Sequence, residues 1–298
     1  MRVPRFVQPG ETLRGSAFHF FPGGKGANQA CAAAKLGSDV LLAARLGTDP
    51  YSKAIYEHLD ACGVQMKAVE TDPNAPTGTA IIQVDDSGQN AICITAGAND
   101  GVNPMYLRRV LPLIDACDIL LLQLEIPIET VHYAIKDHAR RGKFILLDPA
   151  PAAALHNELL RHVDIITPNE TELEQLTGIS IEDENARRAA CEQLSERGVR
   201  MVLHKAGAKG SYLYAEGTLR HFPAYDVTPV DTTAAGDTFN GALANALARG
   251  LPIEQAIDFA NLAGAISTLQ LGAQGAMPTM EQAVAYERTL AVRHETEN

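Results

Sequence analysis

The chain has 298 residues, of which 46% are hydrophobic, so it is long enough for one large α/β domain or two small ones with a sizeable core. Its 25 basic and 36 acidic residues give a net charge of -11, which argues against a partner with a phosphate backbone such as DNA or RNA. No stretch approaches the roughly 20 apolar residues of a membrane span, and the first ten residues contain no apolar signal core. We therefore expect a globular protein that is neither secreted nor membrane-inserted.

The cysteines are odd in number and widely scattered, and none shows the spacing of a paired metal ligand. They stand at Cys31, Cys62, Cys93, Cys117 and Cys191. We interpret them as reduced core residues of a cytoplasmic protein.

In chain order, the first predicted element is a strand-like stretch over residues 12–21, before the first predicted helix. From Ser38 onward, strand-like and helix-like segments alternate, as in a parallel sheet covered by crossover helices. The predicted strands of that sheet span residues 40–46, 119–124, 144–147, 163–167 and 201–203. The predicted helices span residues 51–62, 104–117, 128–141 and 186–197, and helix dominates residues 234–291.

Residues 77–84 and 90–95 break this rhythm, because they alternate in strand fashion around the turn sequence Asp-Asp-Ser-Gly and so predict an antiparallel hairpin. With the first strand-like stretch, the hairpin would form a small accessory sheet outside the parallel core, where a lid is expected. The sequence therefore predicts one α/β domain over residues 1–298, with a lid formed by about residues 10–22 and 77–97.

The most informative motif is Asp-Thr-Thr-Ala-Ala-Gly-Asp at residues 231–237, which leads into a helix of small residues. Consecutive backbone N–H groups at a helix start, here Ala234, Ala235, Gly236 and Asp237, form a site for an anion such as a transferring phosphoryl group. The Asp237 carboxylate would stand in the first turn, where it can take a proton from an attacking hydroxyl. The alternative is that Asp231 caps the helix and Asp237 complements the helix dipole.

Two further segments contain residue types that bind ligands. In the glycine-rich sequence at 22–30, Gly24 permits close approach of a ligand, and Lys25 and Asn28 can hydrogen-bond hydroxyls, although a plain tight turn is the alternative. The spacing of a Walker loop is absent there. Asn169 and Glu172 follow an apolar strand and share one helix face, so they can organise a hydrated Mg2+ near phosphates or simply form an N-terminal capping box.

These three motifs, in this order and at these separations, resemble the ribokinase branch of the pfkB-type carbohydrate kinase family over essentially the whole chain. The spelling Gly-Gly-Lys-Gly-Ala-Asn-Gln-Ala is typical of ribokinases rather than of fructokinases or adenosine kinases. The resemblance implies a three-layer α/β/α sandwich with a mostly parallel central sheet and a small antiparallel β lid. It also implies a sugar kinase that transfers a phosphoryl group from ATP to the 5-hydroxyl of D-ribose, and a homodimer formed through the lid.

The resemblance assigns roles to residues of this chain. Asp237 is the implied catalytic base, beside the N–H groups of Ala234, Ala235 and Gly236, and the implied sugar contacts besides Asp237 are Gly24, Lys25, Asn28 and Glu125. The implied nucleotide contacts are Asn169, Lys205, Ala206, Gly207, Ala208, Lys209, Gly210, Gly236 and Asn261. Glu172 is implied to act on Mg2+ through water, and a site for a monovalent cation, usually K+, is implied at Asp231, Thr233, Ser267, Gln270, Gly272 and Ala276.

One departure from the family pattern concerns the N-terminus. Family members begin with a strand ending in Gly-x-Asn-x-Asp, whose aspartate grips the sugar hydroxyls, whereas Met1–Phe6 corresponds to a position after that motif. We therefore expect the sheet to lack one interior strand and the pocket one sugar contact. A start placed too far downstream and a truncated protein with a damaged pocket both explain this, and the retained Asp237 favours the first.

Three rival functions stay open at this point. The first is a kinase with another acceptor, namely deoxyribose, fructose, another pentose or an adenosine-like nucleoside. The second is a catalytically impaired regulator that binds a sugar or a nucleotide. A dinucleotide-dependent oxidoreductase is the third, and it is disfavoured because no Gly-x-Gly-x-x-Gly follows a first strand.

Overall fold

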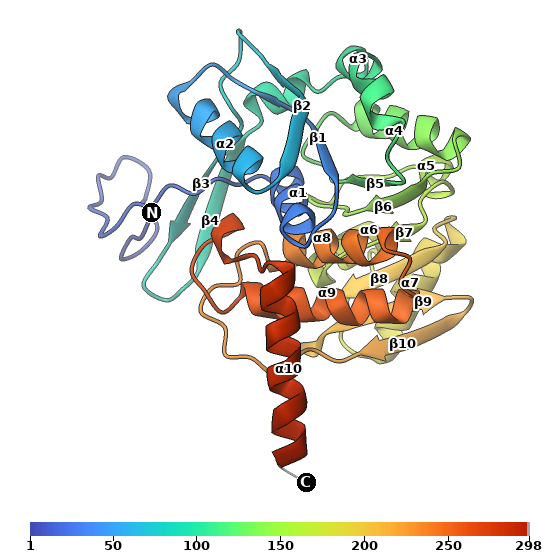
Figure 1. Cartoon of the computed structure of the whole chain (residues 1–298). Coiled ribbons are helices and arrows are strands. Elements are labelled where there is room, and N and C mark those ends of the chain that lie inside the picture. The colour runs from blue at the N-terminus through green and yellow to red at the C-terminus, as the bar shows by residue number, and fades with distance from the viewer. Residues whose placement is uncertain (297–298) are drawn as a thin grey trace.

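The structure is a computed structural model that describes residues 1–296, and it has helices on both faces of a largely parallel sheet (Figure 1). The main sheet has the strand order β10-β9-β8-β7-β6-β5, in which β5 to β8 are parallel and β9 and β10 antiparallel. Its strands are β5 (Ile119–Leu122), β6 (Phe144–Leu147), β7 (Ile165–Ile166), β8 (Met201–Lys205), β9 (Ser211–Ala215) and β10 (Thr218–Phe222).

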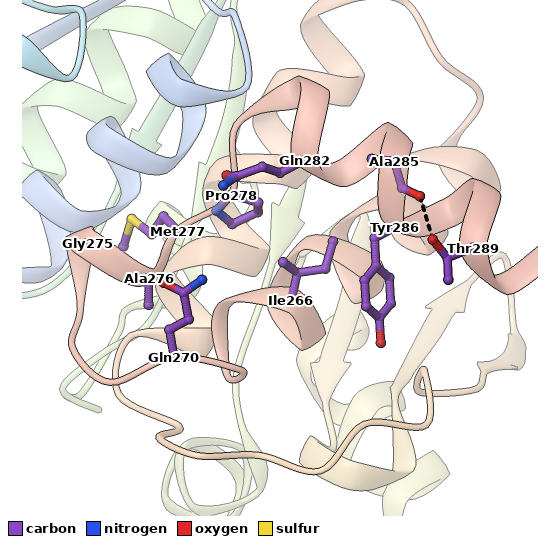
Figure 2. Close-up of a pocket in the computed structure, with 10 residues that line it drawn as sticks. All are labelled: Ile266, Gln270, Gly275, Ala276, Met277, Pro278, Gln282, Ala285, Tyr286 and Thr289. Atoms are coloured by element: carbon purple, nitrogen blue, oxygen red, sulfur yellow. Dashed lines mark hydrogen bonds between the residues drawn. The ribbon is translucent and has the colours of Figure 1, made fainter.

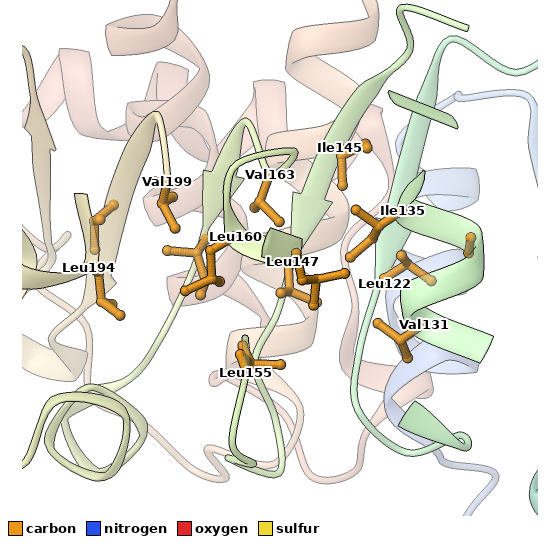
Figure 3. Packing of buried hydrophobic residues seen from close by; sticks show 14 of the residues in the cluster. Leu122, Val131, Ile135, Ile145, Leu147, Leu155, Leu160, Val163, Leu194 and Val199 are labelled. Atoms are coloured by element: carbon orange, nitrogen blue, oxygen red, sulfur yellow. The ribbon is translucent and has the colours of Figure 1, made fainter. Parts of the chain in front are cut away.

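Successive residues of the central strands point into two different cores, as the period of a strand requires. Ile145 and Leu147 pack with the helices of one face (Figure 3), whereas Leu146 between them packs with the helices of the other face. The first face carries α3 (Pro104–Ile114), α4 (Ile128–Arg140), α5 (Asn157–Leu160), α6 (Glu170–Thr177) and α7 (Glu184–Glu196). The second carries α8 (Ala235–Ala248), α9 (Ile253–Ser267) and α10 (Met280–Thr296).

Two further parallel strands form a separate small sheet. β1 (Val40–Leu46) pairs with β2 (Val64–Thr71), and α1 (Lys25–Lys35) and α2 (Pro50–Ala61) lie beside them. Every residue of β1 is only partly buried, although the strand is mostly apolar. The parallel strands are therefore divided between two sheets, and within residues 1–296 β1 and β5 each have a single strand partner.

The predicted hairpin is confirmed as β3 (Thr79–Val84) and β4 (Asn90–Thr95), which project from the body of the molecule (Figure 1). The predicted strand over residues 12–21 is wrong: its only ladder contact is a single bridge between Ala17 and Arg2. Its side chains are mostly exposed, Phe18 to 72%, so no partner strand or core organises the stretch. Cys93 in β4 is also exposed, which corrects the prediction that all cysteines are core residues.

Most other predicted elements are confirmed, with differences at their ends. Pro104 opens α3, and Asn103 caps it. The strand predicted to end at residue 124 ends at Leu122, and the one predicted over 163–167 is reduced to Ile165–Ile166. β2, β9 and β10 were not predicted; the last two form an antiparallel edge whose turn, at Glu216 and Gly217, has positive φ values. Within the described residues, no helix is long and apolar enough to cross a membrane.

Candidate active site

The centre of the candidate site is the first turn of α8, where Asp237 lies with only 7% of its surface exposed. The helix is preceded by Ala234, whose φ of 60° is uncommon for a residue with a side chain. Within residues 1–296, no backbone or side-chain group accepts from the N–H of Gly236 or Asp237, whereas the N–H of Ala235 donates to the Thr232 carbonyl. Of the N–H groups predicted to bind an anion, those of Gly236 and Asp237 therefore remain available within the described residues, whereas that of Ala235 is already bonded.

The Asp237 carboxylate is held by two amides from α1. Asn28 donates to one carboxylate oxygen at 2.8 Å, and Gln29 donates to the other at 2.9 Å. Gly24 precedes α1 with a φ of 92°, a backbone conformation that favours glycine, and space remains open where a Cβ would stand. α1 and α8 pack directly, so two segments about 209 residues apart meet at this carboxylate.

A second buried carboxylate, Asp148, lies beside the first. One of its oxygens accepts from Gln29 at 2.7 Å and the other from the Lys205 ammonium at 2.8 Å. Asp148 is 1% exposed and directly follows β6, whereas Lys205 ends β8. β6 and β8 are parallel and are separated by β7, so both strands end at the same edge of the sheet, where the two side chains meet. Gln29 therefore bridges both aspartates.

Lys25 lies among the acidic groups of the site. Burial lowers the pKa of its ammonium, but the charges of Asp237, Asp148, Glu125 and Glu172 outweigh this and raise the pKa. Its backbone N–H donates to Glu125 at 2.9 Å. Burial also raises the pKa of Glu125, against the opposing effect of its contacts with Lys25. The site thus contains two ammonium groups, those of Lys25 and Lys205, among several carboxylates.

The pKa of Asp237 is raised above the ordinary aspartate value, chiefly because burial penalises the charged carboxylate. Lys25 and the amides of Asn28 and Gln29 oppose this shift, whereas the charge of Asp148 adds to it. A carboxylate with a raised pKa is a stronger base, so this arrangement can remove a proton from a hydroxyl placed next to it.

Asn169 and Glu172 form the capping box that opens α6. The Glu172 carboxylate accepts from the backbone and side-chain nitrogens of Asn169 at 2.8 and 2.9 Å, and Asn169 in turn caps the backbone of Glu172 at 2.8 Å. Burial raises the pKa of Glu172, opposed by the charge of Lys205. The capping-box alternative for this pair is confirmed, and the charges of Lys205, Asp148 and Lys25 also act on the carboxylate.

The loop predicted to contact a nucleotide begins next to this box. The N–H of Lys205 donates to Pro168 at 2.9 Å, and the loop closes through a bond from Ala206 to Gly210 at 2.8 Å. A side chain on Gly236 would meet the Lys205 ammonium at 3.7 Å, which places this loop beside the cradle of α8. The other predicted members are Gly207, Ala208 and Lys209, which form a short 3-10 turn, and Asn261, whose amide donates to Phe222 on β10.

Three of the residues predicted to bind a monovalent cation, Asp231, Thr233 and Gly272, are joined by hydrogen bonds. The Asp231 carboxylate accepts from the N–H and hydroxyl of Thr233 and from the N–H of Gly272, and these bonds lower its pKa against the effect of burial. The alternative that Asp231 caps α8 is therefore wrong, because the residue at the cap position is Ala234 and, among the described residues, no side chain caps the helix. Ser267 lies at the end of α9, where its hydroxyl donates to Gly264.

Gln270 and Ala276 both line a cavity of about 350 Å³ between α9 and α10 (Figure 2). Its remaining lining residues belong to the same C-terminal segment, and none of the predicted sugar or nucleotide contacts is among them. The cavity is therefore separate from the carboxylate centre.

Four side chains of the site escaped the sequence reasoning. Gln29, Asp148 and Gln123 belong to the central network, with Gln123 donating to Gln29, and Gln274 donates to Asn28 at 2.9 Å. Asp148 carried a usable signal, because it is a polar residue directly after a buried apolar strand. Gln29 stands next to Asn28 in the same motif, whereas nothing in the local sequence marks Gln274.

Comparison with known proteins agrees with this geometry. The family described as pfkB family carbohydrate kinase matches residues 1–280. The ribokinase of Haemophilus influenzae is 39% identical over 284 residues, covering 95% of this chain and 93% of the relative, and the deoxyribokinase of Salmonella typhi is 37% identical over 274 residues, covering 92% and 90%. The structure of Arabidopsis thaliana ribokinase complexed with ribose and ATP has a TM-score of 0.90 and 36% identity, over 95% of this chain and 93% of that chain.

Proposed function

The chain belongs to the pfkB family of carbohydrate kinases, and from this premise we propose that it transfers the γ-phosphoryl group of ATP to the 5-hydroxyl of D-ribose, giving ribose 5-phosphate. The observation that carries the proposal is the buried Asp237 carboxylate beside the free N–H groups of its own helix turn. A base and an anion cradle on the same turn are what an in-line transfer between a hydroxyl and a phosphate requires.

In this proposal Asp237 accepts the proton of the sugar hydroxyl as the hydroxyl oxygen attacks the γ-phosphorus. The N–H groups of Gly236 and Asp237 stabilise the negative charge of the transferring group. Asn28 and Gln29 orient the carboxylate, because each holds one of its oxygens. Positioning and charge neutralisation then supply most of the rate enhancement.

We assign the sugar hydroxyls to Gly24, Lys25, Asn28 and Glu125, which surround the base from α1 and from the loop after β5. The nucleotide contacts are assigned to Asn169, to the loop 205–210, to Gly236 and to Asn261. The Lys205 ammonium lies 3.7 Å from the point where a Cβ on Gly236 would stand, and this supports the assignment because the nucleotide loop then lies beside the proposed phosphoryl site.

The buried carboxylates of the site fit a Mg2+ ion that they would contact through the water molecules bound to it. Glu172 and Asp148 are buried carboxylates near the cradle, but each already accepts hydrogen bonds, so we assign Glu172 to waters around the ion rather than to the ion itself. Mg2+ would neutralise charge on the phosphates. K+ fits Asp231, which its hydrogen bonds hold in the ionised form, with Thr233 and Gly272 beside it.

We extend the proposal to a homodimer formed through the lid. Ile82, Ile92 and Ile94 lie on one face of the β3–β4 hairpin and are 38–58% exposed. An apolar face of this kind is suited to burial against its own copy. The five unpaired thiols suit a reducing, ATP-containing compartment, so we propose the cytoplasm as the location.

A second acceptor, 2-deoxyribose, is favoured by the similarity to a deoxyribokinase at nearly the same identity. The two sugars differ by one hydroxyl, and a site built to hydrogen-bond that hydroxyl discriminates strongly against the sugar that lacks it. The pocket residues named above do not by themselves distinguish the two.

The test is ADP release from MgATP with ribose, 2-deoxyribose, fructose or adenosine as acceptor, in potassium and in sodium buffer. We expect the highest kcat/KM with ribose and a higher rate in potassium. A higher kcat/KM with 2-deoxyribose would move the assignment to the second acceptor. ADP release that no sugar stimulates would contradict the kinase proposal and favour a binding protein.

A further inference from the structure

A cluster of sulfur and nitrogen ligands lies outside the carboxylate centre, between α1 and the end of α2. Cys31 comes from α1, His58 from the last turn of α2, and Cys62 is the residue that ends α2. The ligand atoms of these residues all lie within 4.8 Å of one another. No spacing in the sequence indicates this cluster, because 31 residues separate the two cysteines.

The ligand atoms of the cluster are close enough together to bind one ion after a small movement. The two Sγ atoms are 2.9 Å apart, and Sγ of Cys62 is 3.7 Å from Nε2 of His58. Zinc–sulfur bonds of about 2.3 Å at a tetrahedral angle require about 3.8 Å between the sulfurs, so the pair opens by roughly 1 Å on binding. Cys62 can supply this movement, because it stands past the helix and before Gly63, whose φ is 89°.

Burial and chemistry narrow the class of ion. Cys31 is fully buried in an apolar cluster with Leu59, Val64 and Met66, whereas His58 and Cys62 are partly exposed. Two thiolates with one divalent cation have no net charge, which suits an apolar surrounding. Thiolate and imidazole ligands select zinc-like or copper(I)-like ions and not Mg2+, so the magnesium of a kinase reaction would not compete.

We propose that Cys31, His58 and Cys62 bind one zinc-class metal ion, with water in the fourth position. The partly exposed His58 and Cys62 leave one side open for that water. The bound ion links α1 to α2. Because α1 also carries Asn28 and Gln29, the link fixes the helix that orients Asp237 without touching the reacting groups.

The test is a cobalt titration of the metal-free full-length chain, in a phosphine reductant and without nucleotide. We expect one equivalent of Co2+ to give a thiolate charge-transfer band and tetrahedral d–d bands, and Zn2+ to displace both. Cys62→Ser and His58→Gln should each lower zinc affinity by more than about 100-fold, since loss of outer-shell partners alone costs 10–100-fold. Cys93→Ser removes an exposed thiol on β4 and is the matched control, with unchanged affinity.

A thermal melt gives a second readout. Zn2+ should raise the Tm of the wild type and of Cys93→Ser, but not that of Cys62→Ser. Absence of the thiolate band in the reduced wild type would overturn the proposal, as would equal zinc affinity in all variants. Formation of a Cys31–Cys62 disulfide in air, with no cobalt spectrum in reductant, would overturn it in favour of a dithiol switch. None of these readouts depends on sugar phosphorylation, so they stand apart from the test of the kinase.

Discussion

The carboxylate centre and the β3–β4 hairpin differ in whether their side chains have contact partners within the chain. Around Asp237 and Asp148, buried amides and ammonium groups hold all four carboxylate oxygens. On β3 and β4, large apolar side chains are exposed, and the hairpin pairs chiefly with itself, apart from a bridge to Arg2. The centre is therefore organised before a ligand binds, whereas the β3–β4 hairpin has an exposed apolar face.

The largest effect should follow from removing the base of the preorganised centre. In Asp237→Asn we expect kcat to fall about 10²–10⁴-fold, because an amide cannot accept the hydroxyl proton, while ATP binding is largely kept. Stopped assays of ADP release and equilibrium binding of ATP measure the two quantities. Asp60→Asn, on the exposed surface of α2, is the matched control. Full activity of Asp237→Asn would remove Asp237 from the role of base.

The next effect tests whether the buried ion pair stabilises the centre. Asp148→Ala leaves the Lys205 ammonium without its partner, which should lower the free energy of unfolding by about 3–5 kcal/mol. Urea unfolding measures this change. The double variant Asp148→Ala with Lys205→Met should recover part of the loss, because it removes the unpaired charge. Equal losses in the single and double variants would show that the ion pair is not the cause.

A charge placed on the β3–β4 hairpin should weaken the proposed dimer and leave the folding of the chain nearly unchanged. Ile92→Glu places a carboxylate on the apolar face of the hairpin, so we expect the dimer to weaken at least about tenfold, with a small change in Tm. Light scattering across a dilution series measures the dimer. Gln83→Glu lies on the opposite face of the same hairpin and serves as the control. A monomeric wild type would contradict the proposed dimer directly.

The smallest effect is a shift in pH dependence. The base acts when deprotonated, so kcat/KM should fall as pH falls through the raised pKa of Asp237. Gln29→Leu removes a hydrogen bond that lowers this pKa, so the acidic limb of the profile should move to higher pH. Profiles of kcat/KM for wild type and variant measure the shift. A limb that moves to lower pH would contradict the proposed role of Gln29.

Local patterns predicted the parts of the fold and site that depend on neighbours in the chain. The 144–147 strand, the hairpin and the capping box at Asn169 follow from spacing and propensity over a few residues. The stretch 12–21 also alternates like a strand, but a strand needs a partner along its length, and Ala17 has only one bridge. The alternation of apolar and polar residues therefore indicated a strand propensity, but within the described part of the chain residues 12–21 have no partner strand along their length.

The sequence by itself determined the α/β alternation and the two helix starts at residues 22–30 and 231–237, the second of which contains Asp237. Each of these features is encoded in contiguous residues. Tertiary structure alone decided that Gln29 bridges two aspartates, that Lys205 pairs with Asp148, and that Cys31 meets His58 and Cys62. These contacts join residues 27 to 208 positions apart. They depend on which strands end at the same edge of the sheet and on how the helices pack. No local periodicity in the sequence predicts either of these.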